Sequence, residues 1–290
     1  MERIEHDLQV LSHLKADNPR MFFLGENSFC LPSAKLLEIM GLARAYIPRV
    51  NSFAMYARID DIARKSDEEL ARLRRAGLNA LHIGLESGCD TILEAMDKGV
   101  SAQDAILQLQ RLDDVGILYH VTLVGGLGGR KLSWRHALDT AHLLNQIHPM
   151  SVWVLKLNLF EGTPLYEEHQ RGEFDLMEPA EVLREEIALL EHLEHPEFVF
   201  MDTTVLNTYS LVGKLPERYD TLLTAAYFLL SQEFQEEGLA EAQEEPNRSQ
   251  NDEGALQRPA GRESSPKEDT SIKGRITSAP ASNDWQNLLL

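Results

Sequence analysis

Two charged residues, Glu86 and Lys156, stand in segments whose composition predicts β-strands, 81–87 and 153–160. Both segments alternate apolar and polar residues, so each charged residue shares one face of its strand with other polar positions. The leucine-rich face of 81–87 suits packing against helices, which directs Glu86 inward. Two charges pointing into one barrel lumen are costly unless they pair or bind a ligand. Glu86 and Lys156 therefore either neutralise each other or line a polar pocket.

A glycine-rich turn, GGLGG at 125–129, follows another predicted strand, 117–124. The dinucleotide motif G-x-G-x-x-G is not met, because its third glycine would fall at Lys131. The turn therefore indicates either close backbone approach to a ligand or ordinary turn geometry.

Composition narrows the class of protein. The 290 residues include 28 Lys and Arg against 46 Asp and Glu, a formal charge of −18, which disfavours non-specific nucleic-acid binding. The longest nearly unbroken apolar stretch, 222–230, is too short for a bilayer, and no signal peptide is read, so we expect a cytoplasmic protein without membrane contact. The only cysteines, Cys30 and Cys89, exclude a disulfide framework and any metal site of three thiolates within this sequence; no metal ligand is assigned.

Short apolar runs alternate with helical patterns through residue 237. Strands are expected at 21–25, 50–56, 80–85, 117–124 and 151–159, with helices between them and further helices at 179–193 and 216–235. This alternation predicts βαβ units and a parallel sheet, either closed as a barrel or partial barrel or open and doubly wound. In both architectures a site is expected at the carboxyl ends of the strands, where polar and glycine-rich residues stand.

Composition changes at residue 238. Residues 238–290 contain few large apolar side chains, so they cannot bury enough surface to offset the entropy of ordering. We therefore expect a folded domain over 1–237 and a disordered acidic and polar tail over 238–290.

Residues 77–99, GLNALHIGLESGCDTILEAMDKG, resemble the central segment of radical S-adenosylmethionine (radical SAM) enzymes, G-x-E-S-G-x-D-x-x-L-x-x-x-x-K-G after the fourth barrel strand. Residues 113–117 and 124–129 are similar to the helix and strand that follow, and 134–149 and 161–166 resemble a bacterial subgroup of unassigned activity related to the Elp3, MiaB and NifB-like branch. The resemblance covers about residues 1–230. It implies a TIM-type (β/α) barrel of parallel strands.

The resemblance also implies a cofactor, S-adenosylmethionine, and its contacts. Residues 23–27 are similar to the strand end that contacts the methionine amino group. The resemblance implies that Glu86 and Ser87 face the ribose or methionine part and that Lys98 contacts a carboxylate. It also implies that the region of Gly125 and Leu157 lines the adenine. The implied cofactor-binding residues are Glu26, Asn27, Glu86, Ser87, Lys98, Gly125, Gly126 and Leu157.

The sequence departs from the family at the iron–sulfur motif. The family holds a [4Fe-4S] cluster with C-x3-C-x2-C after its first strand, and Cys30 and Cys89, 59 positions apart, do not replace that motif. The chain begins in what resembles the helix after this loop, so we expect a partial barrel, truncated at its N-terminus and lacking the first strand. Its open sheet edge would permit association with a partner.

The resemblance implies, for a complete protein, reductive cleavage of S-adenosylmethionine to a 5′-deoxyadenosyl radical that acts on an unknown substrate. Without cluster ligands, this chain is expected to be inactive alone. Two alternatives stay open: a non-catalytic barrel that binds a ligand or protein partner, and a mis-assigned start with no stable fold.

Overall fold

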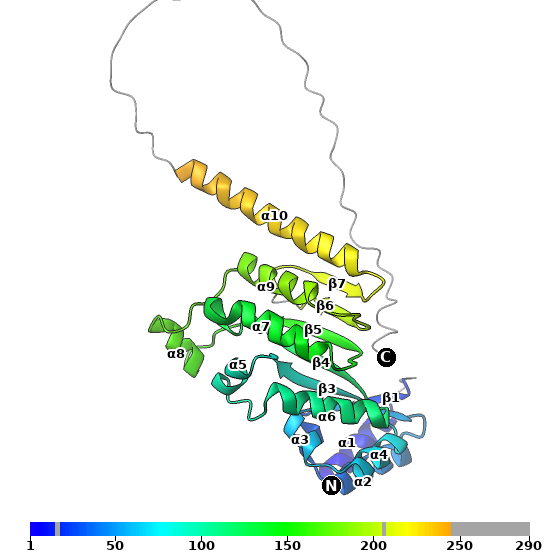
Figure 1. Cartoon of the computed structure of the whole chain (residues 1–290). Coiled ribbons are helices and arrows are strands. Elements are labelled where there is room, and N and C mark those ends of the chain that lie inside the picture. Colours follow the sequence, from blue (N-terminus) through cyan, green and yellow to red (C-terminus); the bar gives the residue numbers. More distant parts are fainter. Residues whose placement is uncertain (15–17, 205–206, 245–290) are drawn as a thin grey trace, which may run out of the picture. The chain divides into compact units, whose positions relative to one another are not determined.

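The computed structural model describes residues 1–14, 18–204 and 207–244, with 234–244 described by their backbone only (Figure 1). Within these residues seven strands form one sheet in chain order. The strands are β1 (Arg20–Phe23), β2 (Ser52–Ala57), β3 (Leu78–Glu86), β4 (Leu118–Gly125), β5 (Ser151–Lys156), β6 (Val199–Asp202) and β7 (Leu211–Lys214). β1 to β6 are parallel, whereas β7 runs antiparallel to β6.

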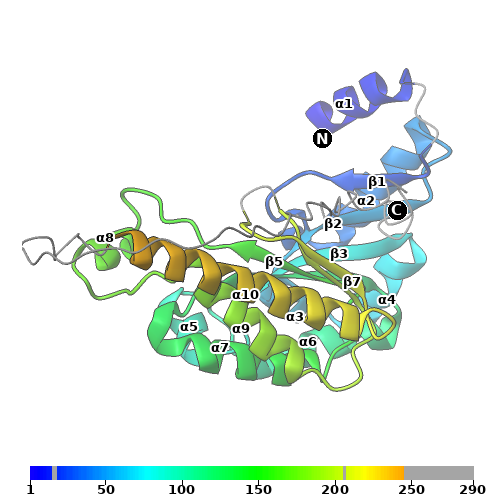
Figure 2. The same ribbon diagram turned by 90° about the horizontal axis from the view of Figure 1, so that it is seen from above.

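Helices connect the parallel strands. They are α1 (Glu2–Ser12), the 3-10 turn Ser28–Cys30, α2 (Ser33–Tyr46), α3 (Ile59–Ala63), α4 (Asp67–Arg75), α5 (Asp90–Ala95), α6 (Ala102–Val115), α7 (Gly129–Leu144), α8 (Pro164–Gln170), α9 (Pro179–Glu191) and α10 (Tyr219–Glu244). Helices α5, α6, α7 and α9 lie on the same side of the sheet (Figure 2). The predicted partial (β/α) barrel of parallel strands is confirmed.

Local sequence signals set several helix ends. Ser66 and Ser101 begin α4 and α6 with capping boxes, in which the serine hydroxyl accepts from a backbone N–H three residues on and an acidic side chain bonds back. Gly116 ends α6 in the left-handed conformation.

The final helix, α10, is longer than expected. It extends to Glu244, so the first seven residues of the predicted tail, 238–244, continue the helix. The rest of that predicted tail, 245–290, lies outside the described residues. No helix in the described part of the chain is long and apolar enough to span a membrane.

The sheet divides its surroundings into two faces. Val121, Leu123, Val152 and Val154 point to the side that carries the helices and are buried, together with Leu81, Ile83 and Leu85 of β3. We call this side the helix face, and the opposite, concave side of the partial barrel the lumen face. A side chain on a strand reaches one face or the other according to its position in the two-residue repeat.

Gly77, between α4 and β3, provides a test of this packing. Its φ is +99°, and a Cβ added there would meet the backbone oxygen of Asn51 at 2.6 Å. Gly77→Ala is expected to lower the free energy of unfolding by about 3 kcal/mol, from backbone strain and this contact. Gly116→Ala is the matched control, because its φ is +72° but the atom nearest to an added Cβ lies 3.9 Å away. Urea unfolding should therefore show a loss of only about 1 kcal/mol in the free energy of unfolding. Equal losses would show that the Asn51 contact relaxes.

Candidate functional site

The carboxyl edge of β3 ends in Glu86 on the lumen face. His82, Gly84 and Glu86 are half-buried, while the alternate residues of β3 are buried on the helix face. The alternation predicted for this strand is confirmed.

Glu86 has a strained backbone and a charged partner. Its φ is 66°, a left-handed conformation uncommon for a residue other than glycine, and the register to β4 shifts between Gly84 and Glu86. The ammonium of Lys98 lies 3.2 Å from Glu86 Oε1 and also donates to the carbonyl of Gly84 at 3.2 Å. A Cβ on Gly84 would meet Glu86 Oε1 at 2.5 Å, so a glycine is needed for the carboxylate to fold back toward Lys98.

The prediction that Lys156 points into the lumen with Glu86 is wrong, and so is the alternative in which the two residues neutralise each other. Lys98 is the partner, and Lys156 is exposed on the helix face, where it follows the same parity as Val152 and Val154. The reason is the two-residue repeat: Lys156 is an even number of positions from residues that pack against helices.

Arg58 extends the polar edge at the end of β2. Its guanidinium donates to the carbonyl of Lys98 at 3.2 Å and pairs with Asp60 at 3.0 Å. Sequence reasoning missed Arg58, although its place directly after a predicted strand was a usable signal.

Glu26 and Asn27 follow β1 at the same edge. The Glu26 side chain is exposed. The Asn27 amide donates to the carboxylate of Asp61 at 2.5 Å, and Asp61 is buried and pairs with Arg64. Asn27 therefore fixes α3 against the end of β1. β2 lies between β1 and β3, so Glu26 and Glu86 are two strands apart.

Ser87 is buried and faces the helices. Its hydroxyl lies 2.8 Å from His136 Nδ1 and accepts from the N–H of Cys89 at 2.9 Å. His136 Nε2 lies 3.8 Å from Glu185 Oε1, which accepts from the N–H of Gly126 at 2.7 Å. This chain of contacts fixes the turns after β3 and β4 to α7 and α9. The Ser87 hydroxyl is thus engaged with His136, and a ligand on the lumen face would meet only the backbone of Ser87.

Burial sets the protonation of this chain of contacts. It lowers the pKa of His136 to about 4, and it raises the pKa of Glu185 to about 7. His136 is therefore neutral at neutral pH. Sequence reasoning missed both residues, because each stands inside a predicted helix far along the chain from Ser87.

Aromatic side chains line the lumen face on the amino-terminal side of Glu86. The rings of His82 and His120 lie 4.4 Å apart, and Phe22 and Tyr56 meet His82 edge-on. His120 Nδ1 and the indole N–H of Trp153 both contact the hydroxyl of Ser151, at 2.7 and 2.8 Å. Burial lowers the pKa of His82 to about 4 and that of His120 to about 3, so both imidazoles are neutral at neutral pH.

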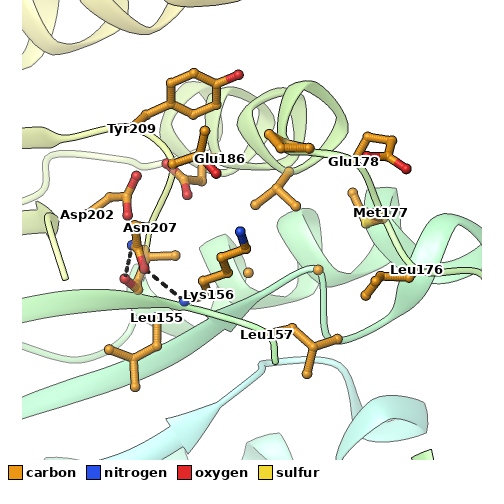
Figure 3. A pocket seen from close by; sticks show the side chains of 16 residues that line it. Leu155, Lys156, Leu157, Leu176, Met177, Glu178, Glu186, Asp202, Asn207 and Tyr209 are labelled. Atoms are coloured by element: carbon orange, nitrogen blue, oxygen red, sulfur yellow. Dashed lines mark hydrogen bonds between the residues drawn. The ribbon is translucent and has the colours of Figure 1, made fainter. Parts of the chain in front are cut away.

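A cavity of about 250 Å³ lies on the helix face, at the carboxyl ends of β4, β5 and β6 (Figure 3). Gly125, Gly126 and Leu157 line it, together with residues of α9 and of the segments 176–179 and 207–209. Figure 3 shows Lys156 directed to the side of α9 and Leu155 to the opposite side. The predicted cofactor residues are therefore not gathered in one place: Glu86 and Lys98 meet on the lumen edge, whereas Gly125, Gly126 and Leu157 border this cavity.

Two buried acids line the same cavity. Burial and the charge of Asp202 raise the pKa of Glu186, on α9, well above its usual range. Burial raises the pKa of Asp202, at the end of β6, to about 7. Sequence reasoning missed both residues, although Asp202 ends β6 and Glu186 lies next to Ile187 on the buried side of α9.

The described residues do not fit an iron–sulfur cluster. Cys30 is exposed and Cys89 buried, and within the described ranges no three His, Cys, Asp or Glu side chains are grouped to hold a metal ion. A cluster held by cysteines needs more thiolates in one place.

Comparisons with known sequences support the resemblance. No family model matches the chain. The chain is 25% identical to Uncharacterized protein MJ0486 of Methanocaldococcus jannaschii over 173 residues. This aligned length covers 59% of this chain and 52% of that protein. Over 110 residues it is 28% identical to a tRNA uridine(34) acetyltransferase of Methanocaldococcus infernus, 38% of this chain and 21% of the relative. The chain thus spans about half and about a fifth of these two relatives.

Solved structures show the fold. The structure of Methanocaldococcus infernus Elp3 with an N-terminal deletion superposes with a TM-score of 0.55 at 15% identity, over 80% of this chain and 58% of that one. Coproporphyrinogen III oxidase (HemN) of Escherichia coli, described as a radical SAM enzyme, gives a TM-score of 0.51 at 17% identity, over 66% of this chain and 44% of that one. These two superpositions confirm the fold that the resemblance implies.

The strain at Glu86 is measurable. Glu86→Ala keeps the left-handed backbone strain and loses the ion pair, whereas Glu86→Gly loses the ion pair and also relieves the strain. Glu86→Gly is therefore expected to have the higher free energy of unfolding, by about 1 kcal/mol. Urea unfolding of the two variants tests this, and a less stable glycine variant would contradict it.

The buried acids give a pH signature. Asp202 has a folded pKa above its unfolded value, so its contribution to stability is complete below about pH 4 and is lost as pH rises through 7. Relative to wild type, Asp202→Asn should gain about 2 kcal/mol of unfolding free energy between pH 5 and pH 8, a figure discounted for partial solvation. The buried histidines lose stability in the opposite direction, as pH falls from 6.5, and this cancels in the difference. The exposed Glu178→Gln is the control and should follow the wild-type curve. A pH-independent Asp202→Asn difference would contradict the analysis.

Proposed function

We propose that this chain forms the S-adenosylmethionine-binding part of a radical SAM barrel, and that Glu86 and Lys98 on the lumen edge of β3 hold the ligand. The observation that carries the proposal is the conformation of Glu86, a glutamate held at positive φ at the carboxyl edge of a barrel strand. In TIM-type barrels this edge is the place of the active site.

The stability of the fold does not account for the left-handed backbone conformation of Glu86. A left-handed backbone costs a residue other than glycine about 1–2 kcal/mol. The ion pair with Lys98 is partly exposed, with 24% and 21% of the two side chains accessible, and pairs of this kind stabilise by about 0–1 kcal/mol. The strain therefore exceeds what the pair returns to stability. Strain of this sort clusters at binding and catalytic sites.

The chemistry of the pair suits the ligand. Glu86 accepts hydrogen bonds and Lys98 donates them, so adjacent positions on one edge match a ligand that has both hydroxyl or ammonium groups and a carboxylate. S-adenosylmethionine has these groups on its ribose and methionine parts. The motif resemblance of residues 77–99 supports the same assignment.

The reaction of the family requires a [4Fe-4S] cluster, which supplies the electron for cleavage of S-adenosylmethionine. The described residues do not fit that cluster, so we assign the chain no step of the cleavage and expect none from the chain alone. A cluster also chelates the amino and carboxylate groups of the ligand, so binding without it should be weak. The activity named for the acetyltransferase relative is not carried over, since only 21% of that protein is matched.

Calorimetry with S-adenosylmethionine tests the proposal. Two charge-assisted hydrogen bonds, at ~1.5–3 kcal/mol each, correspond to a Kd near ~1 mM for the folded wild-type chain. Glu86→Gln, which keeps the shape and removes the charge, should weaken binding at least about tenfold. Asp97→Asn is the matched control, because Asp97 is also acidic and at positive φ but is exposed outside the lumen edge.

Two results would contradict the proposal in different ways. No binding heat from a wild-type sample with a cooperative melt removes the ligand assignment. Equal affinity of wild type and Glu86→Gln removes the residue assignment and leaves the ligand in place.

A further inference from the structure

The cavity on the helix face is separate from the lumen edge. Val154, Lys156 and Asp202 reach it from the sheet, and Val182 and Glu186 reach it from α9 (Figure 3). These strand residues have the parity that packs against helices, opposite to that of Glu86. The sheet itself therefore lies between the two places.

The base of the cavity is a pair of buried acids, Glu186 and Asp202, with one unsatisfied oxygen each. Glu186 is 6% exposed and Asp202 is 2% exposed, and both carboxyl groups point into the cavity, toward each other (Figure 3). In the described part of the chain, each carboxyl is the hydrogen-bond partner of the other. Glu186 Oε2 and Asp202 Oδ1 are buried and receive no N–H or O–H from any described residue. Buried carboxyl groups in proteins ordinarily have donors, so this pair lacks what a ligand would supply.

Neighbouring polar groups are already engaged. The Asn207 amide donates to the carbonyl of Val154 at 2.8 Å and accepts from the N–H of Lys156 at 3.0 Å, so it builds the wall of the cavity. Lys156 is exposed at the rim, and no ion pair within 4 Å joins it to either acid. Apolar walls are formed by Val154, Leu176, Met177, Pro179 and Val182, and Glu178, Thr208 and Tyr209 also line the cavity.

We propose that this cavity binds a small primary alkylammonium ion, with the ammonium group on Glu186 and Asp202 and the alkyl chain against Met177 and Val182. An ammonium group brings three N–H donors, which can reach the two unsatisfied carboxyl oxygens, and a positive charge opposite to that of the acids. A metal ion fits less well, because hard cations require about six oxygen ligands and the described residues include no group of three or more His, Cys, Asp or Glu side chains that could hold one. The volume of about 250 Å³ has room for roughly eight water-sized groups, which suits an amine of four or five carbons.

Nuclear magnetic resonance of the full chain, labelled at the methionine methyl groups, tests this inference directly. Met177 lines the cavity, and its signal is assigned by its loss in Met177→Leu. At pH 8, n-pentylamine should shift the Met177 signal saturably at millimolar concentration. The uncharged 1-pentanol, of the same length, should require at least about tenfold more ligand.

Variants separate the charge from the cavity. The double variant Glu186→Gln, Asp202→Asn removes buried charge and should fold at least as stably, and it should bind the amine no better than the alcohol. Glu94→Gln removes a charge from the exposed side of α5, which does not line the cavity, and should bind the amine as wild type does. A cooperative melt is required of each variant.

Three outcomes would overturn the inference. They are no Met177 shift with n-pentylamine in wild type, equal amine binding by wild type and the double variant, and amine binding seen only after Lys156→Met. The last would show that Lys156 itself serves as the cation of the acid pair. None of them bears on the lumen edge, because S-adenosylmethionine is absent from the experiment.

Discussion

The two-residue repeat of the parallel strands is the constraint on which the rest of this structure depends. Each side chain of β3, β4 and β5 must reach either the lumen face or the helix face. Leu81, Ile83 and Leu85 form core on the helix face, and this leaves Glu86 no other direction than the lumen edge. The same repeat places Lys156 on the opposite side, away from Glu86.

Polar contacts buried between sheet and helices then fix the turns at the carboxyl edge. Ser87, His136, Glu185 and the N–H of Gly126 connect the ends of β3 and β4 to α7 and α9. In a medium of low polarity such contacts are strong when satisfied and costly when broken. The turns that border the lumen edge and the helix-face cavity are therefore held by one set of contacts, although the two places lie on opposite faces.

Stability is reduced at two positions, and for different reasons. At Glu86 the cost is backbone strain on a residue that remains accessible. At Glu186 and Asp202 it is desolvation of carboxyl groups whose hydrogen-bond partners, among the described residues, are each other. Neither feature is required by the barrel, because a glycine at the first position and amides at the second would fit the same backbone.

Short-range patterns in the sequence were sufficient for much of the fold. Alternation in 81–87, the capping boxes at Ser66 and Ser101, and the helix end at Gly116 depend on residues within a few positions, so the sequence alone determined them. The resemblance of 77–99 likewise predicted the barrel fold from contiguous residues. These features need no knowledge of what lies across the sheet.

Tertiary structure decided which distant residues meet. Lys98 rather than Lys156 pairs with Glu86, His136 contacts Ser87 across 49 positions of the chain, and Glu186 faces Asp202 from another element. No local pattern encodes these pairings, because they depend on strand register and on where α7 and α9 cross the sheet. The sequence by itself thus determined the elements and the faces of their side chains, and only the packing of helices on the sheet decided the partners.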